Sequence, residues 1–334
     1  MPSSNVDVSA TRKEYLRQFL VPFWLRPESA LWYAHEAVLA RAALGALRPP
    51  ALEFGCMDAA PTFVMLGGGF DQGFDVYREV AWSEDSMHWQ SLRDDYYNTS
   101  RQAAVEPPHI LRRPAEGFEV GLSWKRAHLD KAARLGLHRR LVEHDPNQPL
   151  TMFEPETFAT VWAPNLYWVD RIDVALRALR RVVRADGRFV TVLPDRSALD
   201  FLLYRFVDRA DPQWIKDLDR GRYSNVSRQA RTLEEWRQVL ASAGWEIEEH
   251  VGFLPRLVLQ VNDVGCRPMF PVLMHIYETL RQRCPEDWLQ IKAHWIKTML
   301  HFMEPLCETE WMERLQMEQV WHLFALRPAA RESR

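Results

Sequence analysis

The sequence lacks several features that mark common classes of protein. Cysteine is scarce, and the four thiols of Cys56, Cys266, Cys284 and Cys307 lie far apart without a CxxC pair. This spacing argues against a zinc ribbon and a disulfide framework, and it indicates a reducing, cytoplasmic compartment. No apolar core follows a basic N-terminus, and the apolar stretch 19–25 is too short to cross a bilayer. The sequence therefore predicts no signal peptide and no membrane partner.

Strong charge of either sign is also absent, since 42 Lys and Arg face 45 Asp and Glu and the formal net charge is -3. Without long basic runs, no binding of nucleic acid is expected. The eleven histidines are scattered, and His35-Glu36 lacks the second histidine of a zinc-protease helix, so no metal site is predicted. No GxSxG or GKS/T motif stands out, and the segment GCMDAA fails the GxGxxG pattern of a nicotinamide-binding dehydrogenase.

What the 334-residue chain does contain is a regular alternation of apolar, strand-like segments with amphipathic, helix-like segments. Gly136 and Gly187 are expected to end two of the helices, and Thr232 with Glu235 forms a capping box before another. Such an alternation predicts a mostly parallel sheet with helices on both faces. The predicted strands are 51–54, 116–124, 139–145, 158–165, 188–194, 245–253 and 320–328, and the predicted helices between them are 60–69, 125–136, 171–187 and 233–244.

Residues 1–48 are expected to form an N-terminal helical segment, either a lid or plain packing, with Ser29 capping a helix over 30–44. Residues 49–334 form one domain in which two inserts, 77–115 and 255–313, interrupt the alternation. Both are expected to leave the sheet where lids over a crevice are built. The second insert carries an apolar helical stripe that is typical of a core or a homodimer interface. The stripe consists of Trp288, Ile291, Trp295, Met299 and Phe302.

Four segments together resemble the class I S-adenosylmethionine (SAM) dependent methyltransferases. LEFGCMDA (52–59) is similar to the family's glycine-rich first motif, and the pair His144-Asp145 to the acidic end of its third strand. FATVWAPNLYWV (158–169) and ALRALRRVVRADGRFVTVLPD (175–195) are similar to its fourth and fifth strands. The resemblance implies a doubly wound α/β fold: a mostly parallel seven-stranded sheet, Rossmann-like, with an antiparallel last strand. It also implies a SAM-dependent transferase that methylates a small molecule or glycan.

The resemblance also implies roles for single residues. Glu53 would hold the loop or the amino group of the methionine part of SAM, and Gly55 would let the backbone approach the cofactor. Asp145 would accept a hydrogen bond from the adenine amino group. Near the sulfonium, aromatic faces could stabilise the positive charge. The residues implied there as catalytic are Asn165, Tyr167 and Trp168, and the remaining cofactor contacts implied are Cys56, Met57, Ser123, Trp124, Pro146 and again Asn165.

The sequence also departs from the family pattern. Met57 and Ala59 replace two glycines of the first motif, and Ser123 stands where the family usually has a carboxylate that grips the ribose hydroxyls. Pro146 offers no backbone N–H to the adenine, and Ala159 replaces an aspartate.

These departures keep two other functions open. One is a SAM enzyme that reacts at the aminocarboxypropyl arm, by transfer or by cyclisation to azetidine-2-carboxylate, and releases methylthioadenosine. The other is a scaffold that has lost the cofactor. In an alternative alignment, GGGFDQGFDVY is the second strand and supplies Asp75 as a ribose ligand. We prefer 116–124 as that strand, because a helix and a third strand follow it at the expected distance.

Overall fold

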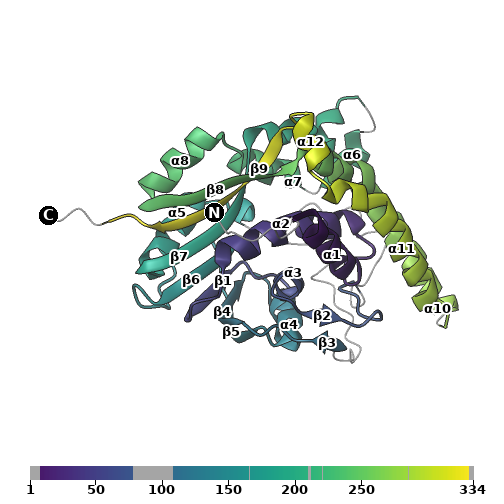
Figure 1. The fold of residues 1–334 in the computed structure, drawn as a ribbon, viewed down its shortest axis with the longest axis horizontal. Helices are drawn as coiled ribbons and strands as arrows, with labels where there is room; N and C mark the ends of the chain where they lie inside the picture. Colours follow the sequence, from purple (N-terminus) through teal and green to yellow (C-terminus); the bar gives the residue numbers. More distant parts are fainter. Residues whose placement is uncertain are drawn as a thin grey trace.

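A seven-stranded sheet forms the centre of the computed structural model (Figure 1). The strand order is β5-β4-β1-β6-β7-β9-β8, and only β9 runs antiparallel to its neighbours, β7 and β8. The strands are β1 (Ala51–Phe54), β4 (Phe118–Ser123), β5 (His138–Glu143), β6 (Phe158–Ala163), β7 (Val183–Pro194), β8 (Trp245–Pro255) and β9 (Gln319–Pro328). The structure describes residues 8–77, 108–164, 166–209, 212–219, 221–284 and 286–330. All seven predicted strands are confirmed.

The second strand of the main sheet is β4, as preferred from the sequence. Leu52 in β1 is aligned with Val120 in β4 on one side and with Val161 in β6 on the other. The glycine-rich segment of the alternative alignment contributes only β2 (Gly69–Phe70), which pairs with β3 (Ile110–Arg112) in a separate two-stranded sheet. Asp75 therefore lies outside the main sheet.

Helices cover both faces of the sheet, so β1 and β6 are buried along their whole length. One face carries α2 (Pro27–Leu44), α3 (Ala60–Met65) and α4 (Arg126–Leu135), whose side chains share a core with Trp162 and Val190. The other face carries α5 (Ile172–Val182) and α8 (Leu233–Ser242), which share a second core with Val161 and Phe189. The fold is doubly wound.

Two of the predicted helix signals are confirmed and two are wrong. Gly136 ends α4 in the left-handed conformation, and the Thr232–Glu235 capping box starts α8. Helix α5 ends at Val182 and not at Gly187, because Val183 already pairs with β6 and the next residues extend β7. Ser29 does not cap α2, which begins at Pro27; proline is suited to a first turn because its φ is fixed there.

The N-terminal segment is part of the helical layer. An additional helix, α1 (Val8–Leu20), packs along α2, and α2 itself contacts β7, β8 and β9. Helix α2 is buried almost all round, with Leu31, Ala34 and Ala37 in the core, which is why it shows little amphipathic pattern. The face of α2 that does not pack on the sheet lines the cavity described below.

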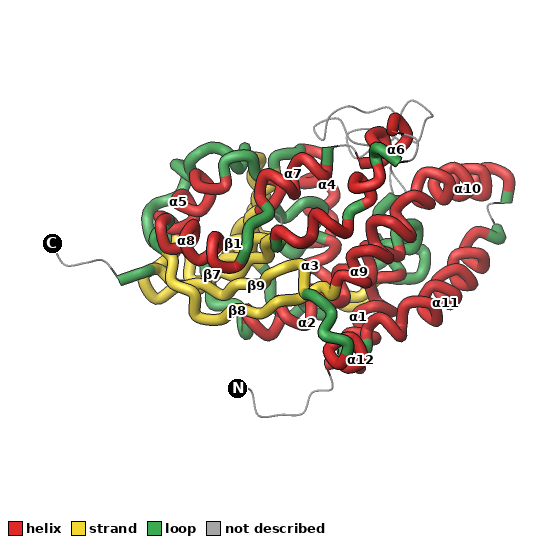
Figure 2. The backbone as a smooth tube through the Cα atoms, turned by 90° about the horizontal axis from the view of Figure 1, so that it is seen from above, coloured by secondary structure: helices red, strands yellow, loops and turns green. Residues whose placement is uncertain are grey.

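The second insert forms a helical arm at one end of the molecule, where α10 and α11 lie side by side (Figure 2). In the predicted stripe on α11, Met299 is buried, whereas Ile291 is 38% and Phe302 55% exposed, so a homodimer interface there stays a prediction. The buried face is rotated toward Lys292 and Met303, because α11 packs against α1 and α2. The arm contains α9 (Arg256–Gln260), a π-helical turn (Val261–Cys266), α10 (Phe270–Arg283), α11 (Trp288–Cys307) and α12 (Glu310–Arg314).

A further connection, between β7 and α8, was not singled out from the sequence. It contains α6 (Pro212–Asp219) and α7 (Arg222–Gln229) and reaches the cavity. Within the described ranges, no helix is long and apolar enough to span a membrane. Most of the first insert lies outside the described residues.

Candidate functional site

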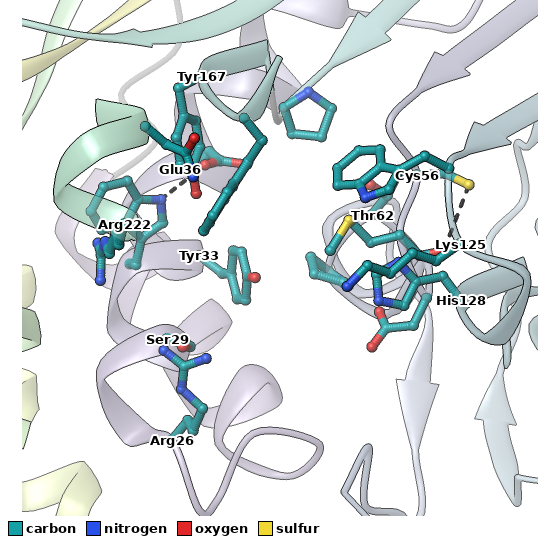
Figure 3. Close-up of a pocket in the computed structure, with 18 of the residues that line it drawn as sticks. Arg26, Ser29, Tyr33, Glu36, Cys56, Thr62, Lys125, His128, Tyr167 and Arg222 are labelled. Atoms are coloured by element: carbon teal, nitrogen blue, oxygen red, sulfur yellow. Dashed lines mark hydrogen bonds between the residues drawn. The ribbon is translucent and has the colours of Figure 1, made fainter. Parts of the chain in front are cut away.

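A cavity of about 830 Å³ opens at the carboxyl ends of β1, β4, β5 and β6. In doubly wound sheets this edge is where ligands bind. Two walls face each other across it (Figure 3). The strand-end wall follows β1, β4 and β5 and includes Cys56, Met57, Trp124, Lys125, His128 and Asp145. The helical wall comes from the N-terminal helices, the turn after β6, α7 and the second insert, and it includes Arg26, Tyr33, Glu36, Tyr167, Arg222 and Asn262.

The loop after β1 has the backbone conformation typical of a glycine-rich loop, although two of its left-handed residues are not glycines. Gly55, Met57 and Ala59 have φ values of 80°, 52° and 63°, all in the left-handed region. The amides of Gly55 and Cys56 both donate to the carbonyl oxygen of Leu122, at 2.9 and 2.8 Å, which ties the loop to β4. A left-handed conformation costs a non-glycine residue about 1–2 kcal/mol, so the rest of the fold imposes this path. Met57 and Ala59 therefore do not close the cavity.

Glu53 lies beneath this loop and is 1% exposed. Thr62 Oγ1 donates to its Oε1 at 2.5 Å, and His138 Nε2 hydrogen-bonds its Oε2 at 2.7 Å. Each carboxylate oxygen therefore already has a partner within the protein. This arrangement suits the first of the two roles implied for Glu53, that of holding the loop.

At the end of β4, the cavity wall is made by the residues after Ser123. Ser123 is buried, does not line the cavity among the described residues, and hydrogen-bonds His128 Nδ1 at 3.4 Å. Trp124, Lys125 and His128 line the cavity instead. Burial, and then the charge of Lys125, lower the pKa of His128 to about 3, so that this ring is neutral.

At the end of β5, two carboxylates border the cavity. Asp145 Oδ1 accepts hydrogen bonds from the backbone N and from Nδ2 of Asn147, at 2.9 and 3.0 Å, which fixes its orientation. Glu143, the partner of Ser123 in the strand register, lines the cavity as well. The sequence analysis missed Glu143, although it immediately precedes the His144-Asp145 pair on the predicted strand.

Tyr167 and Trp168 line the cavity from a short 3-10 turn after β6. The ring of Tyr167 packs edge-on against Trp321 of β9, with centroids 5.6 Å apart, and Trp32 of α2 packs edge-on against the same Trp321 at 4.8 Å. Burial raises the pKa of Tyr167, which keeps the phenol neutral. Asn165, the third residue implied as catalytic, lies outside the described residues.

Glu36 is the acid of the helical wall, and the sequence analysis considered it only as part of a metal motif. It is buried, lines the cavity, and accepts a hydrogen bond from Trp32 Nε1 to Oε2 at 3.1 Å. Burial raises the pKa of Glu36 to about 7. Its neighbour Tyr33 is partly buried, and desolvation raises the pKa of that phenol well above its ordinary value. Glu36 can therefore gain or lose a proton near neutral pH.

Arginines occupy the far end of the helical wall. Arg222 and Arg267 each donate from Nη1 to Oδ1 of Asp263, both at 2.9 Å. Burial alone would raise the pKa of Asp263, but the two guanidinium groups hold it below its ordinary value. No sequence pattern indicates this cluster, because Arg222 comes from the connection between β7 and α8, whereas Asp263 and Arg267 come from the second insert.

Comparisons with known proteins give low similarity throughout. No family model and no curated protein matches the sequence. Among solved structures, the [4+2]-cyclase SpnF is 12% identical, with a TM-score of 0.42, and the match covers 88% of this chain and 82% of that one. A SAM-dependent methyltransferase from Thiobacillus denitrificans, in complex with S-adenosylhomocysteine (SAH), is 11% identical, with a TM-score of 0.41 and coverage of 88% and 90%. Geranyl diphosphate C-methyltransferase from Streptomyces coelicolor A3(2) is 10% identical, with a TM-score of 0.41 and coverage of 98% and 100%.

The strand order and polarity decide the fold, and these scores do not. A doubly wound, seven-stranded sheet with a single antiparallel last strand is the fold expected from the resemblance. The chain has the class I methyltransferase fold.

Within this methyltransferase fold, most of the implied site residues meet at one cavity. Gly55 and Ser123 are the described exceptions, since neither lines it. The residues that do line it are Glu53, Cys56, Met57, Trp124, Asp145, Pro146, Tyr167 and Trp168. No group of three or more His, Cys, Asp or Glu in the described part of the chain could hold a metal ion.

Proposed function

We propose that the protein is a SAM-dependent methyltransferase that acts on a small molecule. The observation that carries this proposal is a single cavity of about 830 Å³ in which the strand-end wall faces a buried acid, Glu36. Ligand pockets have volumes of about 300–1,000 Å³, so this cavity is large enough for a cofactor and a second small molecule.

The strand-end wall fits SAM in three respects. The left-handed backbone at Gly55, Met57 and Ala59 preserves the path that lets a nucleotide-like ligand approach. Asp145, whose Oδ1 is held by Asn147, would accept from the adenine amino group. Glu143 supplies a carboxylate at the strand end next to Ser123, where the ribose carboxylate of the family is missing.

When bound, SAM would supply a methyl group on a sulfonium. The protein's own part is positioning and proton transfer. Glu36, held by Trp32 and with a pKa of about 7, is suited to accept the proton that a hydroxyl or amine nucleophile loses. Tyr167 and Trp168 also line the cavity, and their aromatic faces could stabilise the positive charge of the sulfonium. Trp32 and Tyr167 pack on the buried Trp321, so aromatic side chains form this side of the cavity.

Calorimetry with SAM and with SAH tests cofactor binding. Asp145→Ala and Glu143→Gln are each expected to weaken SAH binding by about tenfold, since each removes an oriented hydrogen-bonding group. Asp186→Ala is the matched control, because this exposed aspartate lies on β7 and pairs with Arg48 at the surface. If neither ligand gave heat or a thermal shift at millimolar concentration, the proposal would be wrong, and a scaffold that has lost the cofactor would be favoured.

Analysis of the nucleoside product tests the chemistry. Methyl transfer leaves SAH. If incubation with SAM alone gave methylthioadenosine above the uncatalysed background, the reacting carbon would belong to the aminocarboxypropyl arm, and methyl transfer would be the wrong reaction.

A further inference from the structure

The guanidinium of Arg222 faces the cavity with most of its donors unused. Its side chain is only 11% exposed, and Asp263 is its one ion-pair partner among the described residues. Arginine has five N–H donors, and the bond to Asp263 uses one nitrogen, Nη1. Its Nε is buried and has no hydrogen-bond partner in the described part of the chain. A buried arginine in this state is poised to bind a ligand.

The neighbouring Arg267 differs, because the protein itself satisfies it. Arg267 bonds Asp263 from Nη1 and donates from Nη2 to the carbonyl oxygens of Leu218 and Asp219, each at 2.9 Å. Asp263 therefore serves two guanidinium groups at once, and its other oxygen, Oδ2, accepts from the amide of Leu203 at 2.7 Å. Arg267 and the backbone amide of Leu203 hold Asp263 in place, and Asp263 in turn positions Arg222.

A hydrogen-bond acceptor on the second insert borders the same end of the cavity. Asn262 is 3% exposed and lines the cavity, and its Nδ2 donates to the carbonyl oxygen of Glu28 at 2.9 Å. Its Oδ1 is buried without a partner among the described residues. A ligand that satisfied both residues would bring an oxyanion to Arg222 and an N–H or O–H to Asn262.

Tyr167 connects this end of the cavity to the acid. Tyr167, Arg222 and Glu36 all line the cavity, and the charges of Arg222 and of Glu36 both act on the Tyr167 phenol, so both groups lie near it. Figure 3 shows Arg222, Tyr167 and Glu36 on the same side of the cavity, opposite Cys56 and Lys125. A small molecule along this wall can therefore reach the guanidinium and the carboxyl at once.

We propose that the acceptor is a small molecule whose oxyanion, a carboxylate or phosphate, binds Arg222 while its own hydroxyl or amine faces Glu36. This assignment rests on the proposed methyl transfer. In the reaction, the acceptor heteroatom gives its proton to the Glu36 carboxylate, and its electron pair forms the new bond to the methyl carbon. The carbon–sulfur bond breaks, its pair stays on sulfur, and the positive charge of the sulfonium is lost.

The test uses benzoate and inorganic phosphate as anionic probes and benzamide as the uncharged match of benzoate. Titrations are done at saturating SAH, so that SAH occupies the strand-end wall. Binding of a probe is then measured at the helical wall. The variant is Arg222→Gln, and its matched control on the same helix is Arg228→Gln, whose exposed side chain pairs with Asp170. Arg222→Lys keeps the charge and covers the case in which the glutamine variant does not fold.

At least one anion should bind the wild type and Arg228→Gln saturably. Its Kd should rise by about tenfold or more in Arg222→Gln and by less in Arg222→Lys. Benzamide should bind more weakly than benzoate. If SAH binds but neither anion does, or if Arg222→Gln keeps the wild-type affinity, the oxyanion assignment is overturned while the methyltransferase proposal stands. If SAH does not bind, the proposed function itself fails, and this inference with it.

Discussion

Met57→Gly tests whether the left-handed loop is imposed by the fold. Met57 has a φ of 52°, which costs a non-glycine residue about 1–2 kcal/mol. Glycine removes this cost, but its greater conformational entropy in the unfolded chain reduces the gain in stability by about 0.4–1 kcal/mol. The expected net gain is therefore about 0.5–1 kcal/mol. With 334 residues and an unfolding entropy of about 2.1 cal/mol/K per residue, this gain raises the Tm by about 1 °C.

Met57→Val is the opposing variant, because a β-branched residue is poorly tolerated at positive φ. We expect it to cost about 1–3 kcal/mol more than Met57→Gly, a difference of about 1.5–4 °C in Tm. Calorimetric scans of wild type and both variants measure these values. Equal stability of the glycine and valine variants would refute a left-handed Met57, and a loss of more than about 1 kcal/mol in Met57→Gly would show that side-chain packing outweighs backbone strain.

Three other predictions concern buried groups and a helix cap. Burial lowers the pKa of His35 from 6.5 to about 3, so the unfolded chain binds the proton first and stability is lost as the pH falls from 6.5 toward 3. Urea unfolding at pH 7.5 and 5.0 should therefore show a loss about 2 kcal/mol larger in the wild type than in His35→Gln, which keeps a donor to Leu306; equal losses would contradict this. The raised pKa of Glu36 stabilises the folded state as the pH falls, and this contribution cancels in the comparison because both proteins contain Glu36. Potentiometric titration should find a group of pKa about 7 that Glu36→Gln removes, and an unchanged curve would count against it. Thr232→Ala should cost about 1 kcal/mol in Tm scans, whereas Ser242→Ala, at the other end of α8, should cost less.

Aromatic contacts hold the side of the cavity where we propose that the acceptor binds. Trp32 and Tyr167 both pack on Trp321, a residue of the last strand, and Trp32 holds Glu36. The acid is thereby fixed relative to the sheet that carries the cofactor loop. This fixed geometry is what a positioning mechanism requires.

The sequence by itself determined the order and type of the central elements. Apolar strands bounded by turn residues located β1, β4 and β6, and local chemistry located the cap at Thr232 and the stop at Gly136, since such signals act over a few residues. The end of α5 was misplaced because strand pairing at Val183, a long-range contact, decided it.

Only the tertiary structure decided which residues form the proposed acceptor side of the site. Glu36, Arg222 and Asn262 come from an N-terminal helix and from two connections far apart in the chain, and no local pattern relates them. The sequence showed that Met57 and Ala59 had replaced glycines, but not whether the loop would keep its path. Hydrogen bonds from Gly55 and Cys56 to Leu122 of β4 tie the start of the loop to the sheet, and Met57 and Ala59 after them lie in the left-handed region. Contacts between distant segments outweighed the local conformational preference at the position where the cofactor is expected.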